Sequence, residues 1–192
     1  MSLSNILNSS KLNGIILTDE EKRLGRYVNE VTNLLMENEW DWFLTLTFKH
    51  PVRDKITVSK AIEKFLNNLS EKAFGGRSKK RIVSFSVIEA GSFDDSLHVH
   101  MMIQDPTGRI LNDSRINRFE LRDAVIESWL AASSSAGNPA LSSSGDEWLK
   151  RIDNVRSTVG YMLKQLDLTQ RKSNDVIVWD QLSLSGRNLR PN

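Results

Sequence analysis

The order of apolar and polar positions along the chain predicts alternating helices and strands. In some stretches apolar residues recur every three or four positions, the spacing of one face of a helix. The first of these opens with a capping box, in which Thr18 is the N-cap and Glu21 lies three residues on. Other stretches are short, apolar or alternating, and bounded by turn residues, as strands are. The predicted helices are residues 18–37, 58–73, 114–131 and 154–168, and the predicted strands are 43–48, 81–89, 97–104, 148–152 and 175–179.

From residue 43 onward these elements follow the order β-α-β-β-α-β. This order predicts an α+β domain with a ferredoxin-like or RRM-like antiparallel sheet, whose helices cover one face and leave the other open for a ligand. We expect residues 1–17 to be a flexible arm, 18–180 the domain and 181–192 a tail. The Ser/Ala/Gly-rich residues 131–146 read as a connector inside the domain.

The predicted strand at 97–104 carries two of the three histidines in the chain. Successive strand side chains point to opposite faces, so His98 and His100 share one face and lie about 7 Å apart along the strand. Two imidazoles at that separation can bind one metal ion. Thr45 and Thr47 are expected on the same open face. The opposite faces of these two strands are apolar (Leu97, Val99, Met101 and Ile103; Leu44, Leu46 and Phe48).

Glu89 is the candidate for a third ligand. A hairpin with a turn at residues 91–96 places it roughly opposite His98. Two imidazoles and a carboxylate suit Mn²⁺ or Mg²⁺, with positions left for phosphate oxygens. However, Glu89 shares the parity of an apolar set (Val83, Phe85 and Val87), which would turn it toward the core. A bulge at residues 89–91 would return it to the histidine face. The alternatives are a solvent-facing glutamate or, less suitably, Asp94 or Asp95 in the turn.

Tyr161 is the candidate nucleophile. The predicted helix at 154–168 has an apolar stripe (Val155, Val159, Met162, Leu163 and Leu166), and Tyr161 lies off it, with Gln165 nearby. Lys164 follows at i+3 and is therefore a neighbour on the helix surface. A tyrosine hydroxyl near a divalent cation can attack phosphorus, while a lysine favours the phenolate or neutralises charge on the phosphate. The alternative is a surface tyrosine packed over a lysine stem.

Taken in order, three short motifs resemble those of one enzyme group. Residues 43–48 (FLTLTF) look like the first motif of rolling-circle replication initiators, residues 97–101 (LHVHM) like the second, and residues 161–164 (YMLK) like the third. The order of Glu89 and then the histidine strand is similar to that in the initiators of viruses with circular single-stranded DNA. The chain thus resembles the HUH endonuclease superfamily, in the single-tyrosine replication initiator (Rep) group.

The resemblance implies an enzyme that nicks and joins single-stranded or hairpin DNA at a replication origin. Tyr161 would stay attached to the 5′ end and leave a free 3′-OH, which initiates rolling-circle replication of a plasmid or virus. Glu89, His98 and His100 would hold Mn²⁺ or Mg²⁺. The third motif holds a single tyrosine, unlike that of two-tyrosine initiators. The chain has no Walker A motif, so unwinding would come from a host helicase.

Other functions fit parts of the same pattern. Single-tyrosine HUH transposases share the motifs, although the helix expected at 18–37 favours an initiator. A non-catalytic RRM-like module would bind single strands on the same face, but it expects exposed aromatics where this chain has histidines and threonines. A metal-dependent phosphoesterase using water would leave Tyr161 without a role.

The amino-acid composition excludes few of these candidate functions. The 192 residues are 39% hydrophobic and 26% charged, with a net charge of +2 and no cysteine, which excludes disulfides and thiolate sites. No signal peptide or membrane-spanning run is apparent, so we expect a cytoplasmic protein of the host cell without membrane contact. With little overall charge, DNA contacts must be local. We expect them from Thr45, Thr47, Arg77, Lys79, Lys80, Arg81, Lys150, Arg156 and Gln165.

Overall fold

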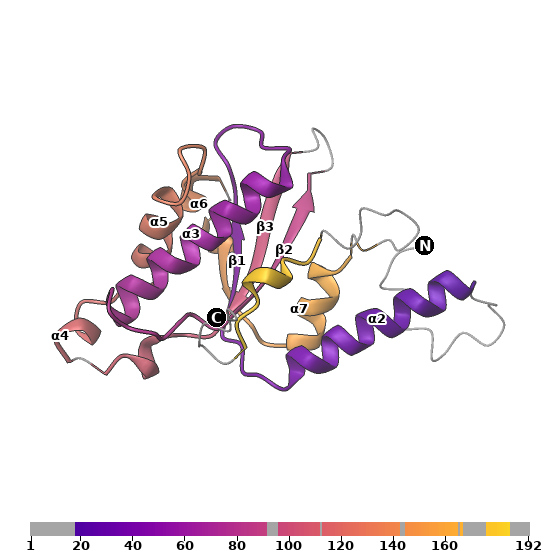
Figure 1. The fold of residues 1–192 in the computed structure, drawn as a ribbon, viewed down its shortest axis with the longest axis horizontal. Coiled ribbons are helices and arrows are strands. Elements are labelled where there is room, and N and C mark those ends of the chain that lie inside the picture. Colours follow the sequence, from indigo (N-terminus) through magenta and orange to yellow (C-terminus); the bar gives the residue numbers. More distant parts are fainter. Residues whose placement is uncertain are drawn as a thin grey trace.

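The computed structural model describes residues 18–91, 96–111, 113–142, 145–164, 166 and 176–184 (Figure 1). The predicted arm at 1–17 and residues 185–192 of the predicted tail lie outside them. The helices are α2 (Asp19–Met36), α3 (Lys55–Phe74), α4 (Asp113–Ile116), α5 (Leu121–Leu130), α6 (Pro139–Ser142) and α7 (Val155–Met162). The strands are β1 (Trp42–Leu46), β2 (Ser84–Ala90), β3 (Leu97–Ile103) and β4 (Leu149–Arg151), and the 3₁₀ turns are η2 (Thr107–Arg109), η3 (Gly145–Trp148) and η5 (Trp179–Gln181).

The strands form a four-stranded antiparallel sheet in the order β2-β3-β1-β4. The predicted α+β class with an antiparallel sheet is therefore confirmed, whereas α4, α5 and α6 lie between β3 and β4 in place of the single helix expected there. β1 and β3 lie at the centre, and their register places Thr45 opposite His100. The β2–β3 register places Glu89 opposite His98. The sheet thus brings the first two predicted motifs side by side.

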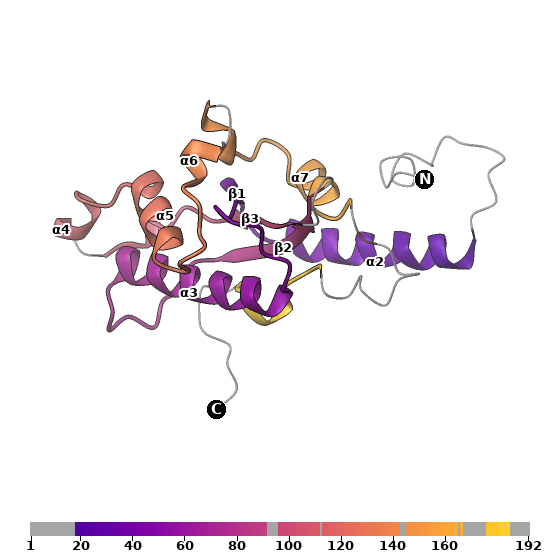
Figure 2. The same ribbon diagram turned by 90° about the horizontal axis from the view of Figure 1, so that it is seen from above.

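One face of the sheet is covered by α3 and α5 (Figure 2). The helices contribute apolar residues at helical spacing, and the strands contribute the alternate positions that the sequence assigned to the core. Hydrophobic burial over this face is the main driving force for folding the sheet. Its principal residues are Leu44, Leu46, Ile62, Phe65, Leu69, Val99, Met101, Val125 and Trp129.

The histidine face is not left open, and that prediction is wrong. α2 and α7 contact each other and pack against this face, as Figures 1 and 2 show. The reason lies in β2 and β3, where apolar residues on the histidine parity would otherwise be exposed to water. A second core results, formed by Val28, Val31, Leu35, Phe85, Val87, Met102, Val159, Met162 and Leu163.

α2 has the predicted start. Thr18 accepts a hydrogen bond from the Glu21 backbone, and the Glu21 carboxylate accepts one from the Thr18 backbone. Such a cap stabilises a helix by about 1 kcal/mol. α2 is therefore held at its first turn before it reaches the second core.

Several predicted boundaries are wrong. The helix expected at 114–131 is divided into α4 and α5, and residues 117–120 between them are not helical. α7 ends at Met162, so Lys164 lies in the turn that follows the helix. β1 ends at Leu46, and the carbonyl of Thr47 instead accepts hydrogen bonds from the Trp129 indole and the Gly137 amide. These bonds redirect the chain out of the sheet.

The strand expected at 175–179 is replaced by a segment, residues 176–184, that follows the edge of β2. It makes isolated antiparallel bridges at Ile177 and Ser183. Backbone hydrogen bonds join it to Ser84, Ser86 and Ile88. Asp175 lies outside the described residues. Among the helices of the described part, none has the length and apolar content to cross a membrane.

Candidate active site

Glu89 lies on the histidine face without any bulge. The β2–β3 ladder is regular from Ser84 to Ala90, so Glu89 keeps the parity of Phe85 and Val87. The predicted conflict disappears because Phe85 and Val87 lie on the same face of the sheet as the histidines. They are buried there by the second core and not by the core under α3 and α5. The bulge proposed at residues 89–91 is absent. The β2–β3 register alone thus places Glu89 opposite His98, as the hairpin predicted.

Two basic side chains, those of His100 and Lys164, contact the Glu89 carboxylate. Its Oε2 lies 2.5 Å from Nε2 of His100, and its Oε1 lies 2.9 Å from Nζ of Lys164. Burial raises the pKa of the Glu89 carboxyl, but the hydrogen bonds of His100 and Lys164 outweigh burial and hold this pKa below its ordinary value. The carboxylate therefore stays ionised at neutral pH.

The two histidines have different surroundings. His100 is buried, with 6% of its surface exposed, and its Nδ1 lies 3.2 Å from the Thr45 hydroxyl. The Phe43 ring stacks on the His100 ring, with centroids 5.3 Å apart. His98 is only partly buried, and its Nε2 lies 3.3 Å from the Ser96 hydroxyl. His100 is thus fixed on several sides, whereas His98 directs its ring toward Ser96, directly before β3.

Tyr161 lies over the centre of this cluster. Its ring meets the rings of His100 and Phe43 edge-on, at centroid distances of 5.5 Å and 5.9 Å, and the residue is 48% exposed. Lys164 Nζ lies 3.9 Å from the centre of the Tyr161 ring. Burial lowers the pKa of Lys164, but its bonds to Glu89 and Tyr161 outweigh burial and raise this pKa. The lysine is therefore a cation that touches both the expected nucleophile and an expected metal ligand.

The donor set fits a divalent cation, although its members do not form a preassembled metal cage. Within the described residues no group of three or more His, Asp or Glu side chains is arranged to hold a metal ion. Glu89 and His100 already direct a carboxylate oxygen and an imidazole nitrogen at each other, and His98 lies directly across the ladder from Glu89. Two imidazoles and a carboxylate on adjacent strands are of the type that would hold Mn²⁺ or Mg²⁺, and His98 would have to leave its contact with Ser96 to join them.

A pocket of about 420 Å³ opens beside Tyr161. It lies over β1 and β4, the half of the sheet away from β2. Its lining combines aromatic rings, hydroxyls and cations. The residues are Phe43, Thr45, Glu147, Trp148, Lys150, Arg151, Ser157, Thr158 and Tyr161.

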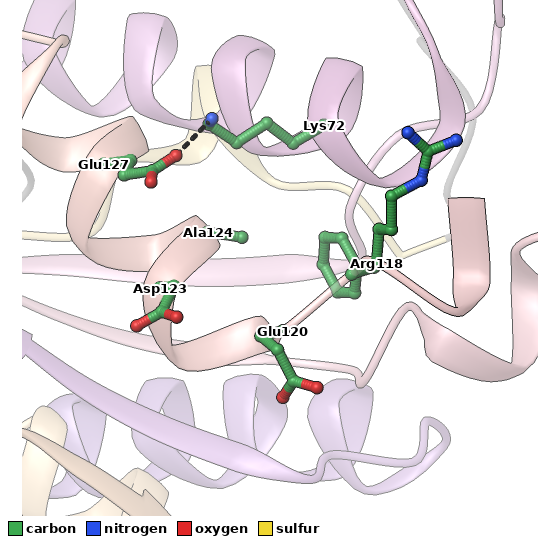
Figure 3. A pocket seen from close by; sticks show the side chains of 7 residues that line it. Lys72, Arg118, Glu120, Asp123, Ala124 and Glu127 are labelled. Atoms are coloured by element: carbon green, nitrogen blue, oxygen red, sulfur yellow. Dashed lines mark hydrogen bonds and ion pairs between the residues drawn. The ribbon is translucent and has the colours of Figure 1, made fainter. Parts of the chain in front are cut away.

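A second pocket, of about 530 Å³, lies between α3 and α5 on the other side of the sheet (Figure 3). Lys72 reaches across it from α3 and pairs with Glu127 of α5 at 2.6 Å. Glu120 and Asp123 also line it. It shares no residue with the Tyr161 cluster and therefore does not extend the site.

The predicted DNA-binding residues do not form one surface. Lys150 lines the pocket beside Tyr161, and Arg156 is exposed on the first turn of α7. The Thr45 hydroxyl is engaged with His100. Gln165 is outside the described residues, and Thr47 follows the end of β1.

The basic run at 77–81 lies apart from the site. It precedes β2, whose first residue, Ser84, pairs with Ile103 at the far end of the ladder from Glu89. Arg77 and Lys79 are exposed, whereas the Lys80 ammonium binds the Arg109 carbonyl and Arg81 binds nearby carbonyls. This placement follows from the sequence order, because the run comes before the strand and Glu89 lies at its end.

Sequence reasoning missed Phe43, Trp148, Ser157 and Thr158. Phe43 could have been found, because it has the same strand parity as Thr45 and must share the histidine face. The other three line the pocket from η3 and α7, and no local signal marks them. No protein-family model, curated protein or solved structure matches this chain, so the family stays a resemblance of short motifs.

Proposed function

We propose that the protein is a metal-dependent endonuclease that nicks and rejoins single-stranded DNA through a covalent bond to Tyr161. The observation that carries the proposal is the position of Lys164, which touches the Tyr161 ring and the Glu89 carboxylate, while Tyr161 also packs on His100. A tyrosine, a cation and two metal-type donors thus meet at one point, from β2, β3, α7 and the turn after α7. A surface tyrosine without function would not require that convergence.

The site chemistry follows from these neighbours. The Tyr161 hydroxyl loses its proton to solvent and attacks phosphorus. A bond forms between the phenolic oxygen and phosphorus, and the bond to the 3′ oxygen breaks, so that this oxygen takes a proton and leaves as a 3′-OH. Lys164 faces the negative charge that develops on the phosphate. A divalent cation held by Glu89, His98 and His100 would polarise a non-bridging phosphate oxygen.

The same arrangement explains joining. The bond between Tyr161 and the 5′ phosphate is also a phosphodiester bond, so a 3′-OH can attack its phosphorus. The bond from phosphorus to the 3′ oxygen forms, the bond to the Tyr161 oxygen breaks, and Tyr161 takes a proton and leaves, which restores the DNA without a nucleotide cofactor. The four-stranded antiparallel sheet, in the order β2-β3-β1-β4, is compatible with the ferredoxin-like fold that we propose and supports the HUH assignment. Within that superfamily we favour a rolling-circle replication initiator acting on origin DNA.

Tyr161→Phe, compared with Tyr27→Phe, tests the proposal. These are the two tyrosines of the chain, and Tyr27 packs beside the second core on α2. The full chain is incubated with Mn²⁺ and a pool of single-stranded and hairpin DNA. Protein–DNA adducts are then detected on denaturing gels and located by mass spectrometry. We expect Tyr161→Phe to lower nicking by about 10³-fold or more and to form no adduct, while Tyr27→Phe retains both activities.

Two results would contradict the proposal. Cleavage that persists in Tyr161→Phe, with no adduct in either protein, would indicate attack by water. No cleavage by the wild-type protein on any member of the pool, with binding retained, would favour a non-catalytic single-strand binding module.

A further inference from the structure

We propose that the pocket beside Tyr161 binds the nucleotide that flanks the phosphate attacked by this tyrosine. The inference rests on the proposed function, because it assigns a place to the DNA that Tyr161 cuts. The pocket's volume of about 420 Å³ falls in the range of small-ligand sites, roughly 300–1,000 Å³, and is too small for a run of stacked nucleotides.

The position of the pocket suits a flanking nucleotide. Tyr161 forms part of its wall, so a ligand bound there lies next to the hydroxyl. The expected metal ligands lie on β2 and β3, whereas the pocket lies over β1 and β4. A phosphate at Tyr161 is therefore bordered by the donor set on one side and by the pocket on the other.

The lining provides the groups that a nucleotide needs. Phe43 and Tyr161 offer aromatic surface for a base, and Ser157 offers a hydroxyl. Lys150 is opposite Phe43 in the β1–β4 register, so its side chain leaves the sheet on the pocket face. Its exposed ion pair with Glu147, at 3.5 Å, is of a kind that contributes little stability. The ammonium can therefore exchange Glu147 for a phosphate.

Trp148 supplies a second, independent indication of a polar ligand. It lines the pocket and is 1% exposed, yet its indole N–H has no hydrogen-bond acceptor among the described residues. Buried donors without an acceptor are uncommon and costly, and sites for a ligand or an ordered water are where they occur. A ligand in the pocket would therefore lie against a residue whose N–H lacks an acceptor among the described residues.

The test uses two variants that act differently. Lys150→Ala removes a cation, and Ser157→Phe fills the pocket from an exposed position on α7. Lys72→Ala is the matched control, because it removes a lysine that is also paired with a glutamate, at the pocket between α3 and α5. The full-length proteins are assayed on a single-stranded DNA pool of random sequence. One arm measures binding by fluorescence anisotropy in EDTA, and the other sequences the ends produced by nicking in Mn²⁺.

We expect both variants to bind DNA about tenfold more weakly, which is the loss of one stacking or phosphate contact. Ser157→Phe should also lose the base preference at one position next to the nick and keep it elsewhere. Lys72→Ala should match the wild type. If Lys150→Ala and Ser157→Phe bind and cut as the wild type does, the pocket is not a nucleotide site, although the proposed function stands. If the wild type forms no Tyr161 adduct on the pool, both proposals fail.

Discussion

The Lys164 ammonium lies 2.9 Å from Oε1 of Glu89, so a residue of the third motif forms an ion pair with an expected metal ligand on the histidine face. A metal ion and Lys164 would draw on the same carboxylate. A metal ion bound by Glu89 would weaken the ion pair between Glu89 and Lys164, and the Lys164 ammonium would then be more available to Tyr161 and to a phosphate. In the proposed mechanism, cation binding would thus be coupled to the preparation of Tyr161 as the nucleophile.

The first prediction follows from this competition. Lys164→Met keeps the length of the side chain but removes its charge, so we expect Mn²⁺ to bind a few-fold more tightly, because Glu89 loses a competing cation. Nicking should nevertheless fall by about 10²-fold, because charge developing on the phosphate is no longer neutralised. Calorimetric titration with Mn²⁺ and adduct formation rates measure the two effects. Weaker Mn²⁺ binding, with nicking unchanged, would overturn the prediction.

The two histidines should differ in their effect on stability. His100→Ala removes a buried ring that packs against both Phe43 and Tyr161, and we expect it to lower the free energy of unfolding by about 2 kcal/mol. His98→Ala alters a partly exposed residue and should change it by about 0.5 kcal/mol or less. Chemical denaturation in EDTA compares them. Both variants should lose metal-dependent nicking, and equal destabilisation would show that the contacts of His100 do not matter.

Thr45 should act as a positioning residue for His100. A metal bound at Nε2 requires the proton on Nδ1, and the Thr45 hydroxyl lies 3.2 Å from Nδ1, where it can accept that proton's hydrogen bond. Thr45→Val should therefore weaken Mn²⁺ binding by about 10-fold or more. Thr45→Ser should restore it, which a purely steric role would not predict. Mn²⁺ titration followed by calorimetry, without DNA, gives the measurement.

Asp105 should make stability depend on acid pH. Burial raises the pKa of the Asp105 carboxyl, but hydrogen bonds from Thr107 and Trp42 outweigh burial and lower this pKa. The stability it contributes is therefore present above its unfolded pKa, about 3.9, and is lost as pH falls through the lower folded value. Asp105→Asn should cost about 1 kcal/mol at neutral pH.

The difference between Asp105→Asn and the wild type should shrink as pH falls below about 4. Denaturant unfolding at a series of pH values follows this change. A difference that stays constant down to strongly acid pH would show that the Asp105 charge is not involved.

Alternation along single strands predicted much of the site. The spacing of Thr45, His98 and His100 fixed their common face, and the helical stripe from Val159 to Leu163 left Tyr161 outside the core, as observed. These inferences needed only the local period of the backbone, which does not depend on distant contacts.

The sequence did not show which helices would pack against each face of the sheet. Phe85 and Val87 were read as facing the single expected core, so Glu89 seemed to need a bulge. In the structure α2 and α7 supply a second core, and the conflict disappears. Helix α7 stops at Met162 for a similar reason. Propensity allowed more turns, but Leu163 and Leu166 reach the second core through a turn after the helix.

The segment at 176–184 has a consequence for association between molecules. It occupies the backbone donors and acceptors along β2, the outer strand that would otherwise present a long unpaired edge. Bare edges of this kind recruit strands from other chains and seed aggregates. On the opposite side, β4 spans only Leu149–Arg151 and offers a short template. A chain shortened before Val176 should thus become prone to self-association even though every residue of the Tyr161 cluster is retained.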